Sequence, residues 1–393
     1  YVHLSALPIV DINISLKQGS ISDGSKPGLT NLMLNTLMDS DINEKKLISY
    51  FENLGAKLSY TVNKETLSIN IRSISDIGQI INLVNILNQA LFTNKIDEVS
   101  FDLQKDKIMR SISESKKKVN SVLESSISER LFDETSLSHQ PFGTRDSVMR
   151  ITEKDIIIHR NRIFNFDNLE INIVGDVSLG NSKRLISQIT NKFSKNKIKA
   201  LPKYNMNSIK YHTEFDSTQS HLAVIIPAIS RTDPDYYNLL VANYVFGGSG
   251  FGSWLMEEIR QKRGLSYSVY SYLSTYQDSG YLRISLQTKN ENIDLAKNII
   301  SEQIERLKKF EVDDSKIKAT KEAILRGFEM RTDTNRKILS LISSINHMNL
   351  DLDYFENYKK LLMQVNKESI KAALNRSMDF ENISVFTVGK TIE

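Results

Sequence analysis

The segment "NLEINIVG" (168–175) recurs near the end of the chain as "NISVFTVG" (382–389), with the final Val-Gly retained. Two further pairs recur in the same order and at nearly the same offset: "TLSINIRS" (66–73) with "YLRISLQT" (281–288), and "FDLQKDKIMRSI" (101–112) with "IKATKEAILRGF" (317–328). Three ordered matches over a period of roughly 200 residues indicate a duplicated domain, because solenoid repeats have far shorter periods.

Each half alternates strands with helices. The segment "IVDINISLKQGS" (9–20) alternates apolar and polar residues up to a glycine turn, which predicts a half-buried strand. A helix over about 28–39 follows, and later comes the amphipathic run "IGQIINLVNILNQALF" (77–92). The pattern predicts an α+β fold in which helices pack on one face of a mainly antiparallel sheet.

The duplication predicts two domains, residues 1–195 and 213–393, joined by a linker over 196–212. The stretch 191–212 is rich in Lys and Asn, contains one Pro and has no apolar periodicity, which is typical of an exposed connection. We expect the two domains to face each other across a cleft.

Composition excludes several classes of function. The 393 residues are 40% hydrophobic and 25% charged, an ordinary globular composition. The formal net charge of +4 is too small to indicate a strongly basic surface that binds nucleic acid. The chain contains no cysteine, which excludes disulfides, thiolate catalysis and cysteine-ligated metals. No apolar run approaches the ~20 residues that span a bilayer.

Two stretches contain unusual polar or glycine residues. In "GLTNLMLNTLM" (28–38), Asn31, Leu34 and Asn35 occupy the spacing at which an inverted zinc-peptidase motif would have His, Glu and His. In "FGGSGFGSWLMEEIRQKRGLSYSVYS" (246–271), a flexible glycine-rich loop precedes a helix that ends at a C-terminal glycine, Gly264. The residues singled out there are Gly247, Gly248, Gly250, Gly252, Arg260 and Tyr267. Taken alone, Arg260 reads as a solvated helix residue and Tyr267 as an aromatic residue opening a strand.

The second stretch resembles a known family. "RQKRGLSYSV" (260–269), placed after a glycine-rich loop in the second half of a duplicated chain, is similar to a segment of the insulinase/pitrilysin zinc metallopeptidases. "HQPFGT" (139–144) and "QSHLAVIIPA" (219–228) also resemble segments of that family. The resemblance covers nearly the whole chain and implies paired α+β domains that form half of a clam-like chamber.

The resemblance also implies which residues would bind zinc in an active member. Two His and a distal Glu bind Zn²⁺ there, and the motif Glu is the general base. Here the motif reads Asn31, Leu34 and Asn35, and the distal position falls at Ser111 or Ile112, with Glu114 out of register. Neutral amides are poor zinc ligands and Leu34 cannot accept a proton. We therefore expect no metal or other cofactor in this chain, and Zn²⁺ in a partner subunit.

The resemblance assigns a role to Arg260 and Tyr267, because active members use an Arg and a Tyr to hold the substrate near its scissile carbonyl. The expected function is that of the non-zinc-binding subunit of a heterodimeric bacterial metallopeptidase. It would be inactive alone and would lend this pair, beside the glycine-rich substrate loop, to a homologous zinc-bearing subunit that degrades unfolded peptides. The alternative is a non-enzymatic scaffold or peptide-binding protein of the same family. We expect a periplasmic location after removal of a targeting segment, with the cytoplasm as the alternative.

Overall fold

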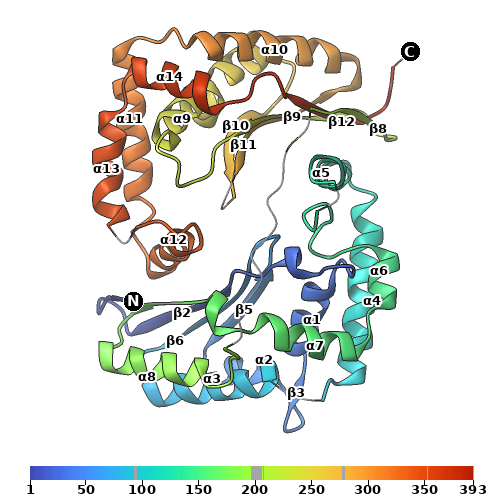
Figure 1. Cartoon of the computed structure of the whole chain (residues 1–393), viewed down its shortest axis with the longest axis vertical. Coiled ribbons are helices and arrows are strands. Elements are labelled where there is room, and N and C mark those ends of the chain that lie inside the picture. Colours follow the sequence, from blue (N-terminus) through green and yellow to red (C-terminus); the bar gives the residue numbers. More distant parts are fainter. Residues whose placement is uncertain are drawn as a thin grey trace. The chain divides into compact units, whose positions relative to one another are not determined.

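The computed structural model describes residues 1–92, 95–133, 135–195, 206, 208–276, 279–351 and 353–392. These residues form two compact units (Figure 1). Unit 1 contains residues 1–115, 133–202 and 331–347, and unit 2 contains 116–132, 203–330 and 348–393. The predicted halves, 1–195 and 213–393, correspond to these units except that each unit also takes one segment from the other half of the chain.

Unit 1 is built on a five-stranded sheet with the strand order β1-β7-β2-β6-β5. The neighbours pair antiparallel except β1 and β7, which are parallel. The strands are β1 (Val2–His3), β2 (Ile9–Leu16), β5 (Lys57–Val62), β6 (Leu67–Ile74) and β7 (Leu169–Gly175). The helices of unit 1 are α1 (Leu29–Met38), α2 (Leu47–Asn53), α3 (Ile77–Phe92), α4 (Glu98–Ser115), α6 (Arg145–Arg150), α7 (Glu153–Ile163), α8 (Leu179–Thr190) and α12 (Asn335–His347).

Unit 2 repeats this topology strand for strand, with the order β8-β12-β9-β11-β10 and a parallel pair only between β8 and β12. The strands are β8 (Lys210–Glu214), β9 (Gln219–Ala228), β10 (Val269–Thr275), β11 (Gly280–Lys289) and β12 (Ser384–Gly389). The helices are α5 (Val119–Leu131), α9 (Tyr236–Asn243), α10 (Ile293–Lys309), α11 (Asp314–Glu329), α13 (Tyr354–Gln364) and α14 (Lys367–Ser377). The predicted α+β fold and its duplication are confirmed.

The repeats exchange one helix. Helix α5 follows α4 in the chain but belongs to unit 2, where it packs on β12 and β9. Helix α12 follows α11 and belongs to unit 1, where it packs on β7 and β2, the strands equivalent to β12 and β9 (Figure 1). The predicted domains, each a single continuous stretch of the chain, did not include this exchange. The predicted linker 196–212 lies mostly outside the described residues, and its last residues, predicted to be irregular, begin strand β8 at Lys210.

The exchanged helix α12 explains why β2 is not half-buried as predicted. The polar residues Asp11 and Asn13 are only 4% exposed, because α12 covers the face of the sheet from which they project. Ser343 of α12 donates a hydrogen bond to Asn13 Oδ1 at 2.9 Å and accepts one from Asn172 at 3.2 Å. A buried polar face is stable only when its groups are hydrogen-bonded, and here α12 supplies part of that bonding.

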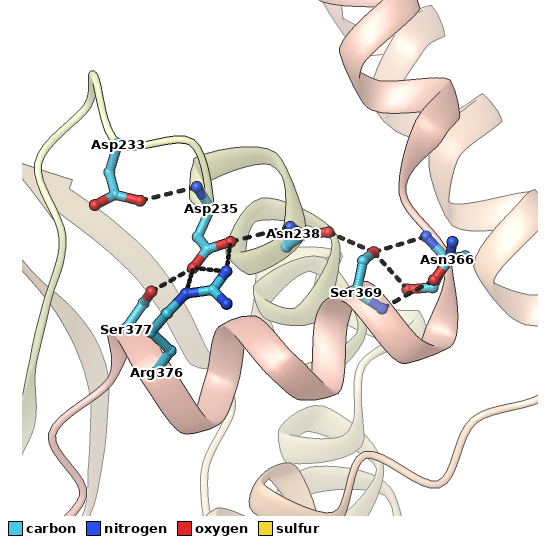
Figure 2. A network of polar contacts seen from close by, with 7 residues as sticks. All are labelled: Asp233, Asp235, Asn238, Asn366, Ser369, Arg376 and Ser377. Carbon is cyan, nitrogen blue, oxygen red and sulfur yellow. Dashed lines mark hydrogen bonds and ion pairs between the residues drawn. The ribbon is translucent and has the colours of Figure 1, made fainter.

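A polar network joins α9 to α14 in unit 2 (Figure 2). The carboxylate of Asp235, itself 4% exposed, accepts hydrogen bonds from Arg376 at 2.7 and 3.0 Å and from Ser377 at 2.5 Å. Asn238 donates to Asp235 at 3.4 Å and accepts from Ser369 at 2.7 Å. These groups satisfy one another, which identifies the network as a structural connection between the two helices.

Candidate functional site

The metal-motif positions lie on α1, whose N-terminus is held by a buried carboxylate. Asp23 accepts hydrogen bonds from the backbone N–H groups of Gly28 at 2.7 Å and Thr30 at 2.8 Å. Gly28 has a φ of 96°, a conformation that favours glycine. Acceptance of free N–H groups at a helix N-terminus stabilises the first turn, so the local sequence specifies where α1 begins.

The side chains at the motif positions are engaged in packing and in local hydrogen bonds. Leu34 has no exposed surface and is part of the hydrophobic core of unit 1. Asn35 donates from Nδ2 to the backbone oxygen of Asn31 at 2.8 Å and to its Oδ1 at 3.0 Å. The two amides therefore bond to each other along one face of α1, and the residue between them is apolar and buried.

The distal position, on α4, is equally unsuited to a metal. Ile112 is 4% exposed and lies in the same core, whereas Ser111 and Glu114 are exposed. Within the described ranges, no cluster of three His, Asp or Glu side chains has a geometry that could hold a metal ion. The residues present do not suit the zinc ion that the family resemblance implies, since in a chain without cysteine Zn²⁺ needs His nitrogen or carboxylate ligands in a tetrahedral set.

A buried chain of polar groups lies behind α1 and was not predicted. Arg162 donates to Nδ1 of His159 at 3.0 Å, and Nε2 of His159 lies 2.8 Å from Oγ1 of Thr30, which in turn donates to Asp23 at 2.5 Å. Burial, assisted by Arg162, lowers the pKa of His159 to about 3. Burial also raises the pKa of Asp23 to about 7, although hydrogen bonds from Thr30 and Gly28 favour its ionised form. Both ring nitrogens of His159 are therefore engaged by residues of the fold, which indicates a structural role for this histidine.

Arg260 belongs to the π-helical turn η5 (Met256–Gln261) of unit 2 and is partly exposed. Its guanidinium lies 4.8 Å from the centre of the Phe251 ring, and the Phe251 side chain is itself 68% exposed. Arginine stacked on an aromatic ring keeps its N–H donors free at the edges. The stacking partner comes from the glycine-rich segment, which sequence reasoning had treated only as a loop.

Tyr267 is 83% exposed, the largest exposed fraction among the large apolar and aromatic side chains described. It was expected to open a strand, but β10 begins two residues later, at Val269. The preceding turn is capped as predicted: Gly264 has a φ of 62° and donates to the backbone oxygen of Arg260 at 2.9 Å. Arg260 begins this capped turn and Tyr267 follows its glycine by three residues, and both side chains are accessible to solvent.

The glycine-rich segment forms helical turns, where a flexible loop was predicted. Gly247 and Gly248 close the π-helical turn η3 (Tyr244–Gly248), and Gly250 and Gly252 bound the 3₁₀ turn η4. A Cβ atom on Gly247 would lie 2.3 Å from Oγ of Ser271. Gly250 has a φ of 68° with open space around it. The first glycine is therefore required by close packing on β10, and Gly250 by its backbone conformation.

A tyrosine pair on β10 was also missed. Tyr270 and Tyr272 are 47% and 37% exposed, and their rings stack with centroids 6.1 Å apart. They project from one face of β10, as alternate residues of a strand do. The spacing of the aromatic residues in "SYSVYSY" was available in the sequence as an indication of this exposed pair.

Two family models match this chain in succession. "Insulinase (Peptidase family M16)" matches residues 3–145, and "Peptidase M16 inactive domain" matches residues 150–324. Together with the duplicated α+β units, these matches show the class of protein. The chain belongs to the insulinase family, peptidase family M16. The family prediction is confirmed, and the apolar and amide residues at the motif positions make this chain a non-catalytic member.

Relatives and solved structures agree with that placement. The chain is 25% identical to the "Non-peptidase homolog YmxG" of Helicobacter pylori over 379 residues, covering 93% of this chain and 84% of the relative. It is 22% identical to the "Uncharacterized zinc protease YmxG" of Bacillus subtilis, covering 75% and 71%. The crystal structure of a peptidase M16 inactive domain from Pseudomonas fluorescens superposes with a TM-score of 0.94 at 23% identity, covering 100% of this chain and 95% of that one.

Proposed function

We propose that this chain is the zinc-free subunit of a heterodimeric peptidase and that it lends Arg260 and Tyr267 to the active site of a homologous zinc-bearing subunit. One contrast within the chain carries the proposal. The motif positions hold a core leucine and two amides that bond to each other, whereas Tyr267 is 83% exposed and Arg260 is partly exposed. The support comes from the two residues together, since a hydroxyl donor and a guanidinium close to each other in sequence are both left accessible to a bound peptide.

The proposed chemistry is electrostatic. The hydroxyl group of Tyr267 can donate a hydrogen bond to the oxygen of a peptide carbonyl as negative charge develops on it, which is typically worth ~10²–10³ in rate. The guanidinium of Arg260 can donate to a neighbouring carbonyl or to a terminal carboxylate. Neither residue can activate water, so this chain alone should not hydrolyse peptides, and unfolded peptides would be the substrates of the pair.

The second candidate is a peptide-binding or scaffold protein without any catalytic partner. A relative described as a non-peptidase homologue favours this alternative. The two functions differ in whether a zinc-bearing homologue is needed.

Co-expression tests the heterodimer. A homologous chain with an intact His-x-x-Glu-His motif, produced with this one, should co-elute with it as a one-to-one complex in size-exclusion chromatography at micromolar concentration. Peptide hydrolysis should then appear only in the co-eluting fractions. Two separate peaks, with all hydrolysis in the zinc-bearing peak, would favour the scaffold.

A further inference from the structure

A pocket of about 510 Å³ lies in unit 2 between α10 and strands β8, β12 and β9. Val224, Ile300 and Ile304 are buried residues that line it, and each is at most 3% exposed. Helix α10 lies on one side of this sheet and α5 on the other (Figure 1). The pocket is therefore on the face opposite the exchanged helix, and neither Arg260 nor Tyr267 lines it.

The internal repeat shows what occupies the same place in unit 1. Helices α3 and α10 are equivalent, and an offset of 216 aligns their buried positions, such as Val84 with Ile300. At that offset Asn88 of α3 corresponds to Ile304, which lines the pocket. Asn88 donates to the backbone oxygen of Gln188 in α8 at 2.8 Å. The pocket-lining face of α10 thus matches the face of α3 that α8 covers.

The strands give the same correspondence. Ile14 of β2 pairs with Ile171 of β7, and Val224 of β9 pairs with Val385 of β12. Both Val224 and Val385 line the pocket. In unit 1, α8 follows β7 directly and buries Leu185 and Ile189 in the core. The pocket of unit 2 is therefore the position that an amphipathic helix fills in unit 1.

No helix of unit 2 takes this position among the described residues. β12 is followed there by Lys390 to Ile392, none of which is helical. The site is also more apolar than its counterpart, because Ile304 replaces the hydrogen-bonding Asn88.

The rim of the pocket is positively charged. Lys210, Lys297 and Lys308 line it, against one carboxylate, Glu305. Lys210 is exposed and makes no ion pair in the part of the chain that the structure describes. Among the described residues, the ion pairs of Lys297 and Lys308 are with carboxylates of their own helix, at 3.0 and 2.5 Å, and exposed pairs of this kind contribute little to stability. Their charges are available to an acidic ligand.

We propose that this pocket binds an amphipathic helix of another polypeptide chain, with apolar residues spaced i, i+4 and i+7 and with Glu or Asp on the flanks. The helical shape follows from α8, and the acidic flanks follow from the three lysines. Apolar side chains would contact Ile300, Ile304 and Val385. Charge complementarity at the rim would select this helix over a basic one.

The test uses two fluorescent 16-residue peptides with the same leucine ridge, one with Glu and one with Lys at the flanking positions. Fluorescence anisotropy with the whole chain should show binding of the Glu peptide and at least ~10-fold weaker binding of the Lys peptide. Ser301→Trp should abolish binding, because Ser301 is an exposed residue that lines the pocket, and the added ring would fill it without disturbing the core.

Lys210→Glu should weaken binding by about 2- to 5-fold, the effect of an exposed charge pair. The control is Lys309→Glu, at an exposed position of α10 that does not line the pocket. This variant should bind the Glu peptide as the parent does. Equal binding of both peptides, or equal binding by the Ser301→Trp variant, would overturn the proposal. Binding of dodecanoate that Ser301→Trp abolishes, without binding of either peptide, would identify a site for fatty acids and would also overturn it.

Discussion

Both terminal guanidinium nitrogens of Arg283 in β11 donate hydrogen bonds to the carboxylate of Glu124, a residue 159 positions earlier in the chain, on the exchanged helix α5. Arg283 is 5% exposed, so its charge has little access to water. Glu124 is the acidic partner that makes this burial tolerable, and a bidentate pair is the strongest geometry for it. Docking of α5 on the sheet of unit 2 therefore depends on a sequence-distant ion pair.

Glu124→Ala should lower the free energy of unfolding by about 2 kcal/mol. This is less than the 3–5 kcal/mol typical of a fully buried pair, since the Glu124 side chain is 37% exposed. Glu129→Ala, at an exposed position of the same helix, is the control and should stay within about 0.5 kcal/mol of the parent. Urea denaturation measures both, and an effect for Glu124→Ala no larger than that of the control would refute the role given to this pair.

Restoring the metal motif should not restore a metal site. Leu34→Glu places a carboxylate in a fully buried apolar position, so we expect a loss of more than about 3 kcal/mol in unfolding free energy. The triple variant Asn31→His, Leu34→Glu, Asn35→His should bind no stoichiometric zinc, because Ile112 and Ser111 provide no distal carboxylate. Elemental analysis after dialysis checks this, and about one zinc per chain would contradict it.

The two kinds of glycine in the segment before Arg260 should respond differently to alanine. Gly247→Ala should cost about 1–3 kcal/mol, since its Cβ would meet Leu255 at 2.7 Å as well as Ser271. Gly252→Ala meets only Ser249 Oγ at 3.7 Å and has no positive φ, so it should be neutral or should stabilise by up to about 1 kcal/mol. Thermal unfolding of the two variants compares them, and similar losses in both would show that close packing does not explain Gly247.

The buried His159 should make the protein sensitive to acid. Its pKa of about 3 in the folded state lies below the usual 6.5, so the unfolded chain binds more protons between these values. Stability from His159 is therefore complete above pH 6.5 and is lost as the pH falls, by about 1.4 kcal/mol per unit. Asp23 acts in the opposite sense: its raised pKa, about 7, makes its contribution fall as the pH rises from 3.8.

Comparison with a variant isolates the histidine. The stability advantage of the parent over His159→Gln should shrink by about 2 kcal/mol between pH 6.5 and 5. His3→Gln, at an exposed position, serves as the control. A constant difference between the parent and His159→Gln across this range would show that His159 is not held neutral.

The fold could be predicted because the strand alternation and the order of the repeated segments can both be recognised in the sequence without knowledge of tertiary contacts. The exchange of α5 and α12 could not be predicted, since an amphipathic pattern shows that a helix packs but not on which sheet. For the same reason the strand over 9–20 was expected to be half-buried, whereas its polar residues are covered by α12. At the site, the sequence pattern correctly located helix α1, expected over about 28–39 and observed at Leu29–Met38. The stacking of Arg260 on Phe251 depends on the turns that the glycines allow, and residue spacing alone does not specify it.

Steady-state cleavage of a quenched fluorescent peptide by the reconstituted pair tests most directly whether Tyr267 acts in trans. Tyr267→Phe removes one hydroxyl from a side chain that is 83% exposed, so assembly should be unchanged. Arg260→Ala should lower activity with a larger share in KM, and Arg263→Ala, whose partner is Glu258, is its control. For Tyr267→Phe we predict a fall in kcat/KM of roughly 10²-fold at unchanged complex yield; full activity of that variant would show that the Tyr267 hydroxyl has no part in catalysis.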